Sequence, residues 1–314
     1  MKHLFIINPA AGSRDRSRAI VAAIDEACQS KNLDYQVKVS TRAGDCCRLA
    51  REAAKTGEEL KIYACGGDGT LNEVCAGAAG CDNAAITVFS GGSGNDFVKL
   101  FDDPTAFYDL NRLLDSEETT FDLIDCNGEI SMNICSVGLD ARIAADMAKF
   151  KRMPMLHGQR AYLASTAVNL FRGISEHSVV EIEGESFDGD HTFICVCNGR
   201  FYGGGFNPIP EASPADGWLD VLIVDKIYLP QVPFLIGKYK SGNYQKLGKL
   251  VRHYKTREVK VHCDKDSAIN LDGEIRFAKD IEFKLSDKKI RFFYPKGLTW
   301  QNKVTEKKAS PATR

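Results

Sequence analysis

Apolar residues follow different patterns in the two halves of the chain. In the first 122 residues, short apolar runs alternate with stretches in which apolar residues recur at helical spacing. The runs predict buried parallel strands at residues 2–7, 35–39, 60–65 and 85–89. The stretches between them predict helices at residues 15–31, 43–55 and 70–79. This alternation predicts a doubly wound, mostly parallel α/β sheet, whose ligands bind at the carboxyl ends of its strands.

Beyond residue 122, helices become rare and short alternating runs predict mostly antiparallel β structure, as a sandwich or a split barrel. These runs are residues 121–126, 130–137, 179–183, 192–197, 218–224, 258–263, 281–285 and 289–293. Helices are predicted at residues 141–147, at residues 160–171 and after Pro233. We therefore expect an α/β domain at residues 1–122, a β-rich domain at residues 123–298 whose last strand can return to the first domain, and a disordered polar tail at residues 299–314.

A glycine motif, Gly66-Gly67-Asp68-Gly69-Thr70, separates the third predicted strand from the next helix. Glycines let backbone N–H groups approach a ligand, and a helix N-terminus attracts an anion such as phosphate. Asp68 is unusual in an anion site unless a divalent cation lies between carboxylate and phosphate, or unless the carboxylate orients a hydroxyl. The alternative is a tight turn in which Asp68 and Thr70 compete to cap the helix. We favour a nucleotide bound with a metal.

Small or polar residues also follow the other three predicted strands. They form the loops at residues 8–13 and 90–97, and Thr41 lies in the loop between them in sequence. Asp96 is either an acid that starts a helix or a functional partner of Asp68 across adjacent strand ends. Paired acids at one sheet edge suggest a metal site or a proton relay.

Composition excludes several classes of function. The 314 residues are 44% hydrophobic and 26% charged, with a net charge of −1, which is typical of a soluble globular protein and offers no field to attract nucleic acid. No apolar run approaches the ~18 residues of a membrane-spanning helix. The eleven cysteines lack zinc or redox spacing and are expected to be reduced and buried. We expect a cytoplasmic protein that contacts membranes only peripherally.

Three stretches of the second half carry polar residues that sheet packing does not explain. The glycine triplet at residues 203–205 and the segment around Asp216 form a long loop, and long ordered loops usually bind something. Asp272 and Glu274 flank a glycine, which is typical either of a hairpin turn or of a catalytic carboxylate pair. Asp140 lies at a strand-to-helix junction, where it caps the helix or serves the site.

Taken together, these motifs resemble the diacylglycerol kinase catalytic-domain family of bacterial soluble lipid kinases, which is related to sphingosine and ceramide kinases. The resemblance covers residues 1–295. The matching motifs, in chain order, are Asn8-Pro9 with Gly12, Gly66 to Thr70 with Asn72-Glu73, Gly92 to Phe97, Gly138 to Ala141, Gly203 to Gly205 followed by Asp216 to Val221, and Asp272-Gly273-Glu274. The family more usually has threonine at the position of Ser93.

The resemblance implies a two-domain fold with ATP in the cleft between a nucleotide-binding α/β domain and a β-rich lipid-binding domain. The implied reaction is transfer of phosphate from ATP to a lipid hydroxyl, with diacylglycerol converted to phosphatidate in phospholipid biosynthesis. The residues implied to contact ATP are Asn8, Pro9, Ala10, Ala11, Gly12, Thr41, Gly66, Gly67, Asp68, Gly69, Thr70, Leu71, Asn72 and Ser93.

The resemblance also implies the catalytic and metal-binding groups. Asp272 is the implied general base, and Glu274, Asp68 and Asp96 complete a magnesium and hydrogen-bond network. A structural magnesium ion is implied at Asp216, with backbone ligands near Ser213 and Trp218. Phosphoryl transfer requires charge neutralisation and alignment more than covalent groups, so these residue types suit the implied reaction.

Two other functions and the mode of membrane contact stay open at this stage. The same glycine motif suits an NAD kinase, and a nucleotide-binding sensor without catalysis is the alternative outside enzymes. The basic, acid-free segment at residues 238–257 is typical of a surface that binds anionic lipid, or of an ordinary solvated helix face. Nothing in the pattern identifies the lipid, and a homodimer through an exposed sheet edge is compatible with it.

Overall fold

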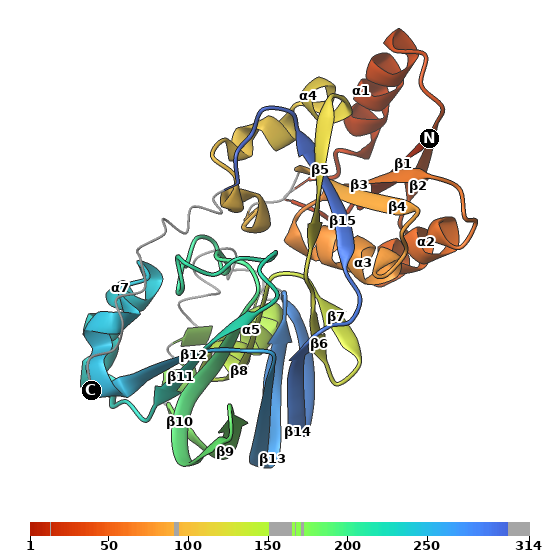
Figure 1. Cartoon of the computed structure of the whole chain (residues 1–314). Coiled ribbons are helices and arrows are strands. Elements are labelled where there is room, and N and C mark those ends of the chain that lie inside the picture. The colour runs from red at the N-terminus through yellow and green to blue at the C-terminus, as the bar shows by residue number, and fades with distance from the viewer. Residues whose placement is uncertain (13, 91–93, 151–164, 167, 171–172, 301–314) are drawn as a thin grey trace.

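The computed structural model of this protein describes residues 1–12, 14–90, 94–150, 165–166, 168–170 and 173–300. The described chain forms two sheets, one above the other in Figure 1. The first part of the chain contributes β1 (Lys2–Ile7), α1 (Ser17–Ser30), β2 (Tyr35–Val39), α2 (Asp45–Ala54), β3 (Leu60–Gly66), α3 (Asp68–Ala78) and β4 (Ala84–Ser90). Strands β1 to β4 pair in parallel, which confirms the predicted α/β class.

Helix α3 begins at Asp68, two residues earlier than the sequence pattern predicts. The reason is the extended backbone of Gly67, whose carbonyl accepts a hydrogen bond from Leu71 N and so starts the helix directly after the strand. Helix α1 begins later than expected, because the Asp15 carboxylate accepts hydrogen bonds from the backbone N–H and hydroxyl of Ser17 in front of the helix.

Two strands from the second half of the chain complete the first sheet. The sheet order is β2-β1-β3-β4-β15-β5, in which β15 (Ile290–Pro295) pairs in parallel with β4 and antiparallel with β5 (Ser116–Phe121). Phe292 of β15 is fully buried, and its ring packs against Phe97, Phe101, Phe107 and Phe121. Two of these rings lie in the short helices η1 (Phe97–Leu100) and η2 (Pro104–Tyr108), which α4 (Leu110–Leu114) follows in the chain. The return of β15 thus builds an aromatic core between segments far apart in sequence.

The predicted strand at residues 121–126 is divided at Asp122. This side chain is only 2% exposed and accepts hydrogen bonds from Gly217 N and Lys289 Nζ, both at 2.8 Å. Asp122 N in turn donates to the carbonyl of Pro214. The backbone therefore turns at Asp122 from the first sheet into the second, where β6 (Ile124–Cys126) begins.

The second sheet is antiparallel throughout, in the order β12-β11-β10-β8-β13-β14-β6-β7. Strand β9 pairs with both β10 and β13, which closes part of this sheet into a barrel-like unit. The remaining strands are β7 (Glu129–Ser131), β8 (Ile134–Gly138), β9 (Glu176–Ile182), β10 (Glu185–Cys197), β11 (Leu219–Asp225), β12 (Val251–Thr256), β13 (Glu258–Leu271) and β14 (Glu274–Leu285). The predicted run at residues 130–137 is divided at Met132 and Asn133, whose backbone turns around Asp272.

Helices cover one side of the second sheet. They are α5 (Leu139–Phe150), η3 (Leu229–Gln231), α7 (Val232–Lys240) and η4 (Tyr244–Leu250). Helix α7 confirms the helix expected at Pro233, since proline is tolerated in the first turn of a helix. The helix expected at residues 160–171 falls largely outside the described residues, as does the tail from residue 301. No helix of the described chain has the length and hydropathy to cross a bilayer.

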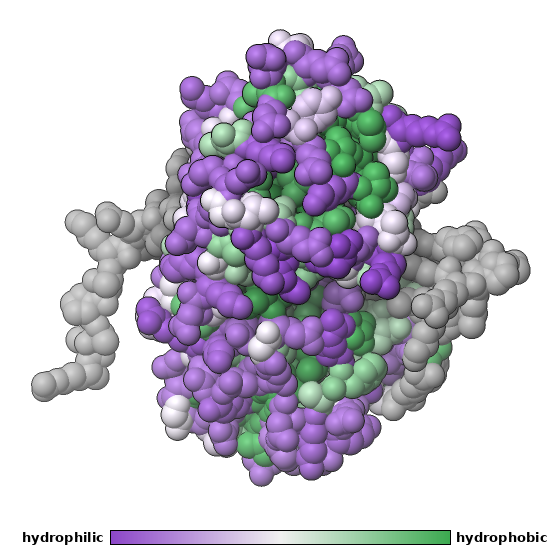
Figure 2. Space-filling view, turned by 90° about the vertical axis from the view of Figure 1, so that its right-hand side faces the viewer, coloured by the Kyte–Doolittle hydropathy of each residue, from purple (hydrophilic) through white to green (hydrophobic). Residues whose placement is uncertain are grey.

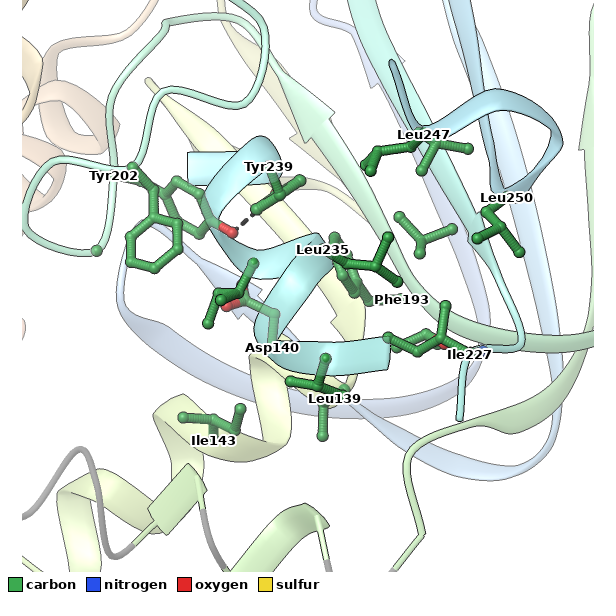
Figure 3. A pocket seen from close by; sticks show the side chains of 17 residues that line it. Leu139, Asp140, Ile143, Phe193, Tyr202, Ile227, Leu235, Tyr239, Leu247 and Leu250 are labelled. Carbon is green, nitrogen blue, oxygen red and sulfur yellow. Dashed lines mark hydrogen bonds between the residues drawn. The ribbon is translucent and has the colours of Figure 1, made fainter. Parts of the chain in front are cut away.

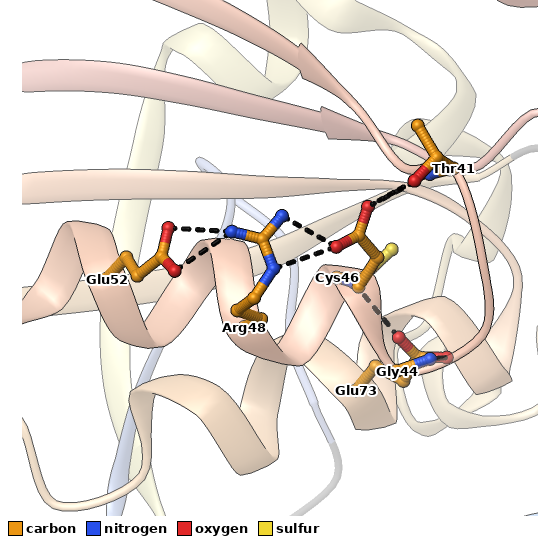
Figure 4. A network of polar contacts seen from close by, with 7 residues as sticks. Thr41, Gly44, Cys46, Arg48, Glu52 and Glu73 are labelled. Carbon is orange, nitrogen blue, oxygen red and sulfur yellow. Dashed lines mark hydrogen bonds and ion pairs between the residues drawn. The ribbon is translucent and has the colours of Figure 1, made fainter.

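A polar network joins α2 to α3 beside the glycine motif (Figure 4). The Glu73 carboxylate of α3 accepts hydrogen bonds from Gly44 N and Cys46 N, both at 3.1 Å, and so caps the start of α2. Arg48 of α2 pairs with Asp45 in its own first turn and with Glu52 one turn later. The network fixes the second βα loop against the third.

Gly66 carries the sharpest steric constraint in this region. A Cβ at this position would lie 2.3 Å from Thr70 Oγ1 and 2.7 Å from Thr70 Cβ. We expect Gly66→Ala to displace Thr70 and lower the free energy of unfolding by about 1–3 kcal/mol, as measured by urea denaturation. Gly69→Ala is the matched control, because a Cβ there meets no atom of the described residues within 4 Å. Equal losses in the two variants would contradict this account.

Candidate active site

The glycine motif forms an open helix N-terminus at the carboxyl edge of the first sheet. No side chain of the described residues caps α3, and none of their atoms lies within 4 Å of a Cβ built on Gly69. Free N–H groups of a first helical turn and the helix dipole together attract an anion. Gly69 is exposed and Gly67 half-buried, so an anion can approach the backbone there, whereas Gly66 is buried at the end of β3 against Thr70. Behind this turn lie the buried side chains of Thr70, Leu71 and Asn72.

The loop after β1 contacts the glycine motif through Asn8. Asn8 Nδ2 donates to Thr70 Oγ1 at 3.0 Å, and Asn8 Oδ1 accepts from Ala10 N at 3.0 Å. Gly12 has a φ of 86°, a conformation that favours glycine. The turn after Asn8 consists of Pro9, Ala10, Ala11 and Gly12. The first and third loops, expected from sequence to share a ligand, are therefore in direct contact.

The nucleotide contacts expected in the second and fourth loops are not found beside the glycine motif among the described residues. Thr41 N and Oγ1 both donate to Asp45 Oδ2, at 2.9 and 3.1 Å, so Thr41 holds the start of α2 (Figure 4). These bonds and the Arg48 guanidinium lower the pKa of Asp45. Ser93, the other residue expected to contact nucleotide, lies outside the described residues.

Three aspartates expected to act together lie within electrostatic reach of one another. Desolvation raises the pKa of Asp68, and the negative charges of Asp96 and Asp272 raise it further. Asp68 Oδ1 accepts a hydrogen bond from Phe97 N at 3.1 Å. A Cβ on Gly94 would lie 3.0 Å from Asp68 Oδ2 and 3.7 Å from Asp96 Oδ2, so both carboxylates face the loop after β4. Asp68 and Asp96 are therefore neighbours, as the adjacent strand ends predict.

Asp96 connects the two sheets. It is only 5% exposed; its Oδ1 accepts from Lys99 Nζ at 2.5 Å, and its Oδ2 accepts from Gly204 N at 2.7 Å. Gly204 belongs to the glycine triplet of the second domain and has a φ of 82°. The sequence analysis missed Lys99 and the Gly204 amide. The three-residue spacing of Asp96 and Lys99 could have indicated the ion pair, whereas no local pattern predicts the bond to Gly204.

Asp272 lies in the turn between β13 and β14, with a φ of 49° followed by 98° at Gly273. The hairpin alternative is therefore correct for the backbone. The carboxylate nevertheless points inward: Oδ1 accepts from Ile134 N at 2.8 Å, and Oδ2 accepts from three further donors. These are Ser131 Oγ, Met132 N and Asn133 N, at 2.7, 2.7 and 2.9 Å.

The hydrogen bonds of Asp272 distinguish its two carboxylate oxygens. Among the described residues, Oδ2 accepts three hydrogen bonds, while Oδ1 accepts one. Burial raises the pKa of Asp272, and the four hydrogen bonds oppose that rise. Of the two carboxylate oxygens, Oδ1 is therefore the one with more remaining capacity to accept a hydrogen bond.

Glu274 is placed differently from the three aspartates. It begins β14, its side chain is 53% exposed, and Oε2 lies 3.7 Å from Arg276 Nη1. Within the described chain the bonded partner of Glu274 is this arginine, and not Asp68, Asp96 or Asp272.

The residues present suit a divalent cation at Asp68. Asn72 lies one turn beyond Asp68 on the same side of α3, and its buried Oδ1 accepts no hydrogen bond from the described residues. Carboxylate and amide oxygens are ligands that Mg²⁺ prefers. The two side chains do not form a complete metal cage, since no cluster of three or more acidic, histidine or cysteine side chains in the described ranges has metal-binding geometry.

The expected structural magnesium site at Asp216 suits a metal less well. Asp216 Oδ2 accepts from Lys255 Nζ at 2.7 Å, and Oδ1 accepts from Trp218 N at 3.1 Å. Ser213 is buried next to Pro214, whose carbonyl binds Asp122 N. The Lys255 ammonium therefore already supplies the positive charge that a cation would bring to this loop.

An apolar pocket lies in the second domain between α5, β10, β11 and α7 (Figure 3). It has a volume of about 120 Å³ and a mainly aliphatic and aromatic lining that includes Leu139, Phe193 and Leu235. The loop at residues 202–206 contributes Tyr202, Gly203 and Phe206 to its wall. Because the next residue in that loop, Gly204, donates to Asp96, the pocket adjoins the acidic cluster.

Asp140 is the acidic group of this pocket. Its Oδ2 accepts from Ser136 Oγ at 2.7 Å, and a hydrogen bond from Tyr202 also acts on it. Tyr202 and Tyr239 join their hydroxyls at 2.9 Å (Figure 3). Burial raises the pKa of Asp140, against the effect of its two donors. Asp140 therefore contacts the pocket rather than the nucleotide loops.

Comparison with known proteins agrees with this arrangement. Residues 2–126 match the model of the diacylglycerol kinase catalytic domain, and residues 133–292 match that of the YegS C-terminal NAD kinase beta sandwich-like domain. A Staphylococcus carnosus (strain TM300) protein named "Putative lipid kinase" is 23% identical over 266 residues, which cover 83% of this chain and 86% of that protein. A protein of the same description from Staphylococcus aureus (strain JH9) is 25% identical over 272 residues, with coverage of 85% and 87%.

Solved structures share the fold. A diacylglycerol kinase from Bacillus anthracis str. Sterne superposes with a TM-score of 0.66 at 19% identity, over 93% of this chain and 96% of that chain. A second structure from the same organism has a TM-score of 0.70 at 20% identity, over 93% and 97%. Since the two family models together span both sheets, the chain belongs to the diacylglycerol kinase catalytic-domain family and is a kinase of that family.

Proposed function

We propose that this kinase transfers the γ-phosphate of ATP, bound with Mg²⁺, to the hydroxyl of a membrane lipid, and that the lipid is diacylglycerol. The observation that carries the proposal is the position of Asp96, which adjoins Asp68 of the glycine motif on one side and binds the Gly204 amide beside the apolar pocket on the other. A phosphate site and a hydrocarbon site thus meet at one group of carboxylates.

The nucleotide side of the proposal rests on the open N-terminus of α3. The triphosphate would bind the backbone N–H groups from Gly67 to Thr70, with Asn8 fixing Thr70 from behind. When bound, Mg²⁺ neutralises charge on the phosphates, and Asp68 with Asn72 would hold it. The backbone amides and Asn8 orient the nucleotide toward the acidic cluster.

The acceptor side rests on Asp272 and the pocket. Asp272 Oδ1 would take the proton of the lipid hydroxyl, while its four hydrogen bonds keep the carboxylate in place. The apolar lining suits an acyl chain, and relatives bear names of lipid or diacylglycerol kinases. NAD, which is polar along its whole length, matches such a lining poorly.

We expect Asp272→Asn to lose about 10²–10⁴-fold in turnover, because the amide cannot accept the hydroxyl proton. Asparagine tolerates the positive φ of the turn, but its NH₂ group must face one backbone donor, so we also expect a loss of about 1–3 kcal/mol in stability. Transfer of labelled γ-phosphate from ATP to a panel of lipids in mixed micelles, with NAD in parallel, tests both substrate and base.

Label on diacylglycerol that disappears in Asp272→Asn, with ATP affinity retained, is the expected result. Label on NAD would replace the lipid proposal with the NAD kinase alternative. Bound ATP without transfer to any acceptor would favour the nucleotide-binding sensor. Near wild-type turnover in the variant would remove Asp272 from the role of base.

Asp68→Asn should stabilise the fold while it lowers activity. Because folding raises the pKa of Asp68, the ionised side chain destabilises the native state at neutral pH, and this destabilisation vanishes as the pH falls through the raised pKa. We expect a higher melting temperature than wild type at pH 7, a smaller difference at lower pH, and a loss of turnover of at least about 100-fold. A lower melting temperature at pH 7 would contradict the electrostatic account.

Gly69→Ala tests the nucleotide position separately from catalysis. Its Cβ meets no atom of the described part of the chain within 4 Å, and alanine favours a helix, so stability should be unchanged or slightly higher. If phosphate approaches this backbone, the methyl group should weaken ATP binding about tenfold, or about 1.4 kcal/mol. Calorimetric titration with ATP measures this change; an unaltered affinity would place the triphosphate elsewhere.

A further inference from the structure

Four large apolar side chains are exposed within one short segment of η3 and α7. Phe234 is 65% exposed, Tyr228 62%, Leu229 45% and Ile236 39%. We call these four residues the apolar rim. Leu235, between two of them, is buried, so the helix presents apolar side chains both inward and outward. Apolar side chains gathered on a surface helix indicate a binding surface.

The apolar rim lies at the pocket described above. Val232, Leu235 and Ile236 of α7 line the pocket, and Ile236 is also part of the rim. The outer surface of α7 and the pocket lining are therefore continuous through one side chain. A partner that covers the rim is in direct reach of the pocket.

Lysines accompany the apolar rim on α7 and on the next helix, η4. Lys238 Nζ lies 3.9 Å from the centre of the Phe234 ring, and Lys240, Lys246 and Lys249 are exposed on α7 and η4. The sequence contains no aspartate or glutamate between Lys226 and Arg257. A surface that combines exposed apolar side chains with nearby lysines matches a bilayer that carries anionic lipid best.

The second half of the basic segment at residues 238–257 is engaged within the protein. Arg252 pairs with Asp225, Lys255 pairs with Asp216 at 2.7 Å, and the Arg257 guanidinium lies 5.1 Å from the centre of the Trp218 ring. The structure thus limits the basic part of the predicted membrane surface to the lysines of α7 and η4. The apolar rim, which comes before residue 238 in sequence, adds an apolar part to this surface.

The opposite side of the molecule differs. In Figure 2, which faces away from α7, hydrophilic side chains cover most of the surface and hydrophobic ones appear in smaller groups. Phe277 of β14 is 63% exposed, nearly as much as Phe234, yet lies on another element. It provides a matched control for the apolar rim.

We propose that the apolar rim inserts into the interface of an anionic bilayer while Lys238, Lys240, Lys246 and Lys249 bind the lipid phosphates, so that a lipid passes from the bilayer past Ile236 into the pocket. The identity of the lipid that enters the pocket rests on the proposed function. Bilayer binding by the rim does not, because it requires no phosphoryl transfer.

The experiment is sedimentation of the full chain with vesicles of phosphatidylcholine, with and without phosphatidylglycerol. We expect binding to the anionic vesicles, a loss of about tenfold in affinity for Phe234→Ser, and no change for Phe277→Ser. Replacing Lys246 and Lys249 together by alanine should remove most of the preference for anionic vesicles. Phe234→Ser should keep its activity toward a short-chain diacylglycerol dissolved as monomers, because Phe234 does not line the pocket.

Equal binding of the two phenylalanine variants, or no vesicle binding by the wild-type chain, would overturn the proposal. A wild-type dimer that Phe234→Ser converts to a monomer would also overturn it, since a second copy would then cover the rim. Vesicle binding that Phe234→Ser weakens and Phe277→Ser keeps, in a protein that phosphorylates no lipid, would support the bilayer surface. It would overturn the proposed function instead.

Discussion

The hydrogen bond from Gly204 N to Asp96 is the contact on which the site depends. Asp96 belongs to the loop after β4 in the first sheet, and Gly204 belongs to the loop after β10 in the second. A buried carboxylate left without donors is costly, so the 2.7 Å bond and the Lys99 ion pair give the two loops a strong reason to stay together. A site that needs groups from both sheets requires such a contact.

The same loop connects the acidic cluster to the apolar pocket. Tyr202, Gly203 and Phe206 line the apolar pocket, while the Gly204 amide between them points to Asp96. Positive φ angles of 58°, 82° and 109° at the three consecutive glycines let the backbone turn tightly enough to serve both sides. Side chains with a Cβ would strain each of these positions, which explains a triplet that the sheet alone does not require.

The sequence predicted local structure and the order of the motifs, but not the long-range contacts. Strands at residues 2–7 and 35–39 agree with β1 and β2, because their patterns depend on neighbouring residues alone. The contact between Asn8 and Thr70 could be predicted from the parallel sheet, because adjacent parallel strands end at the same edge. The four donors to Asp272, however, come from residues about 140 positions earlier, and no periodicity encodes their approach. Lys255 at Asp216 escaped prediction for the same reason.

Three buried carboxylates near the site, those of Asp68, Asp140 and Asp272, differ from several other buried carboxylates in lacking a cationic partner among the described residues. Asp45 and Asp122 have cationic partners, whereas burial raises the pKa of Asp68, Asp140 and Asp272 and no cation pairs with these three in the described residues. Backbone amides and hydroxyls keep them in position, and Asp68 and Asp272 leave negative charge concentrated at the acidic cluster, while Asp140 lies at the pocket. A structure optimised for stability alone would neutralise or replace such groups. In the described residues, these carboxylates lie near a helix N-terminus without a side-chain cap and near an apolar pocket. Their presence there is understandable if a bound ligand supplies positive charge and donates a hydrogen bond to Asp272 Oδ1. The electrostatic repulsion in the free protein would then be relieved in the complex.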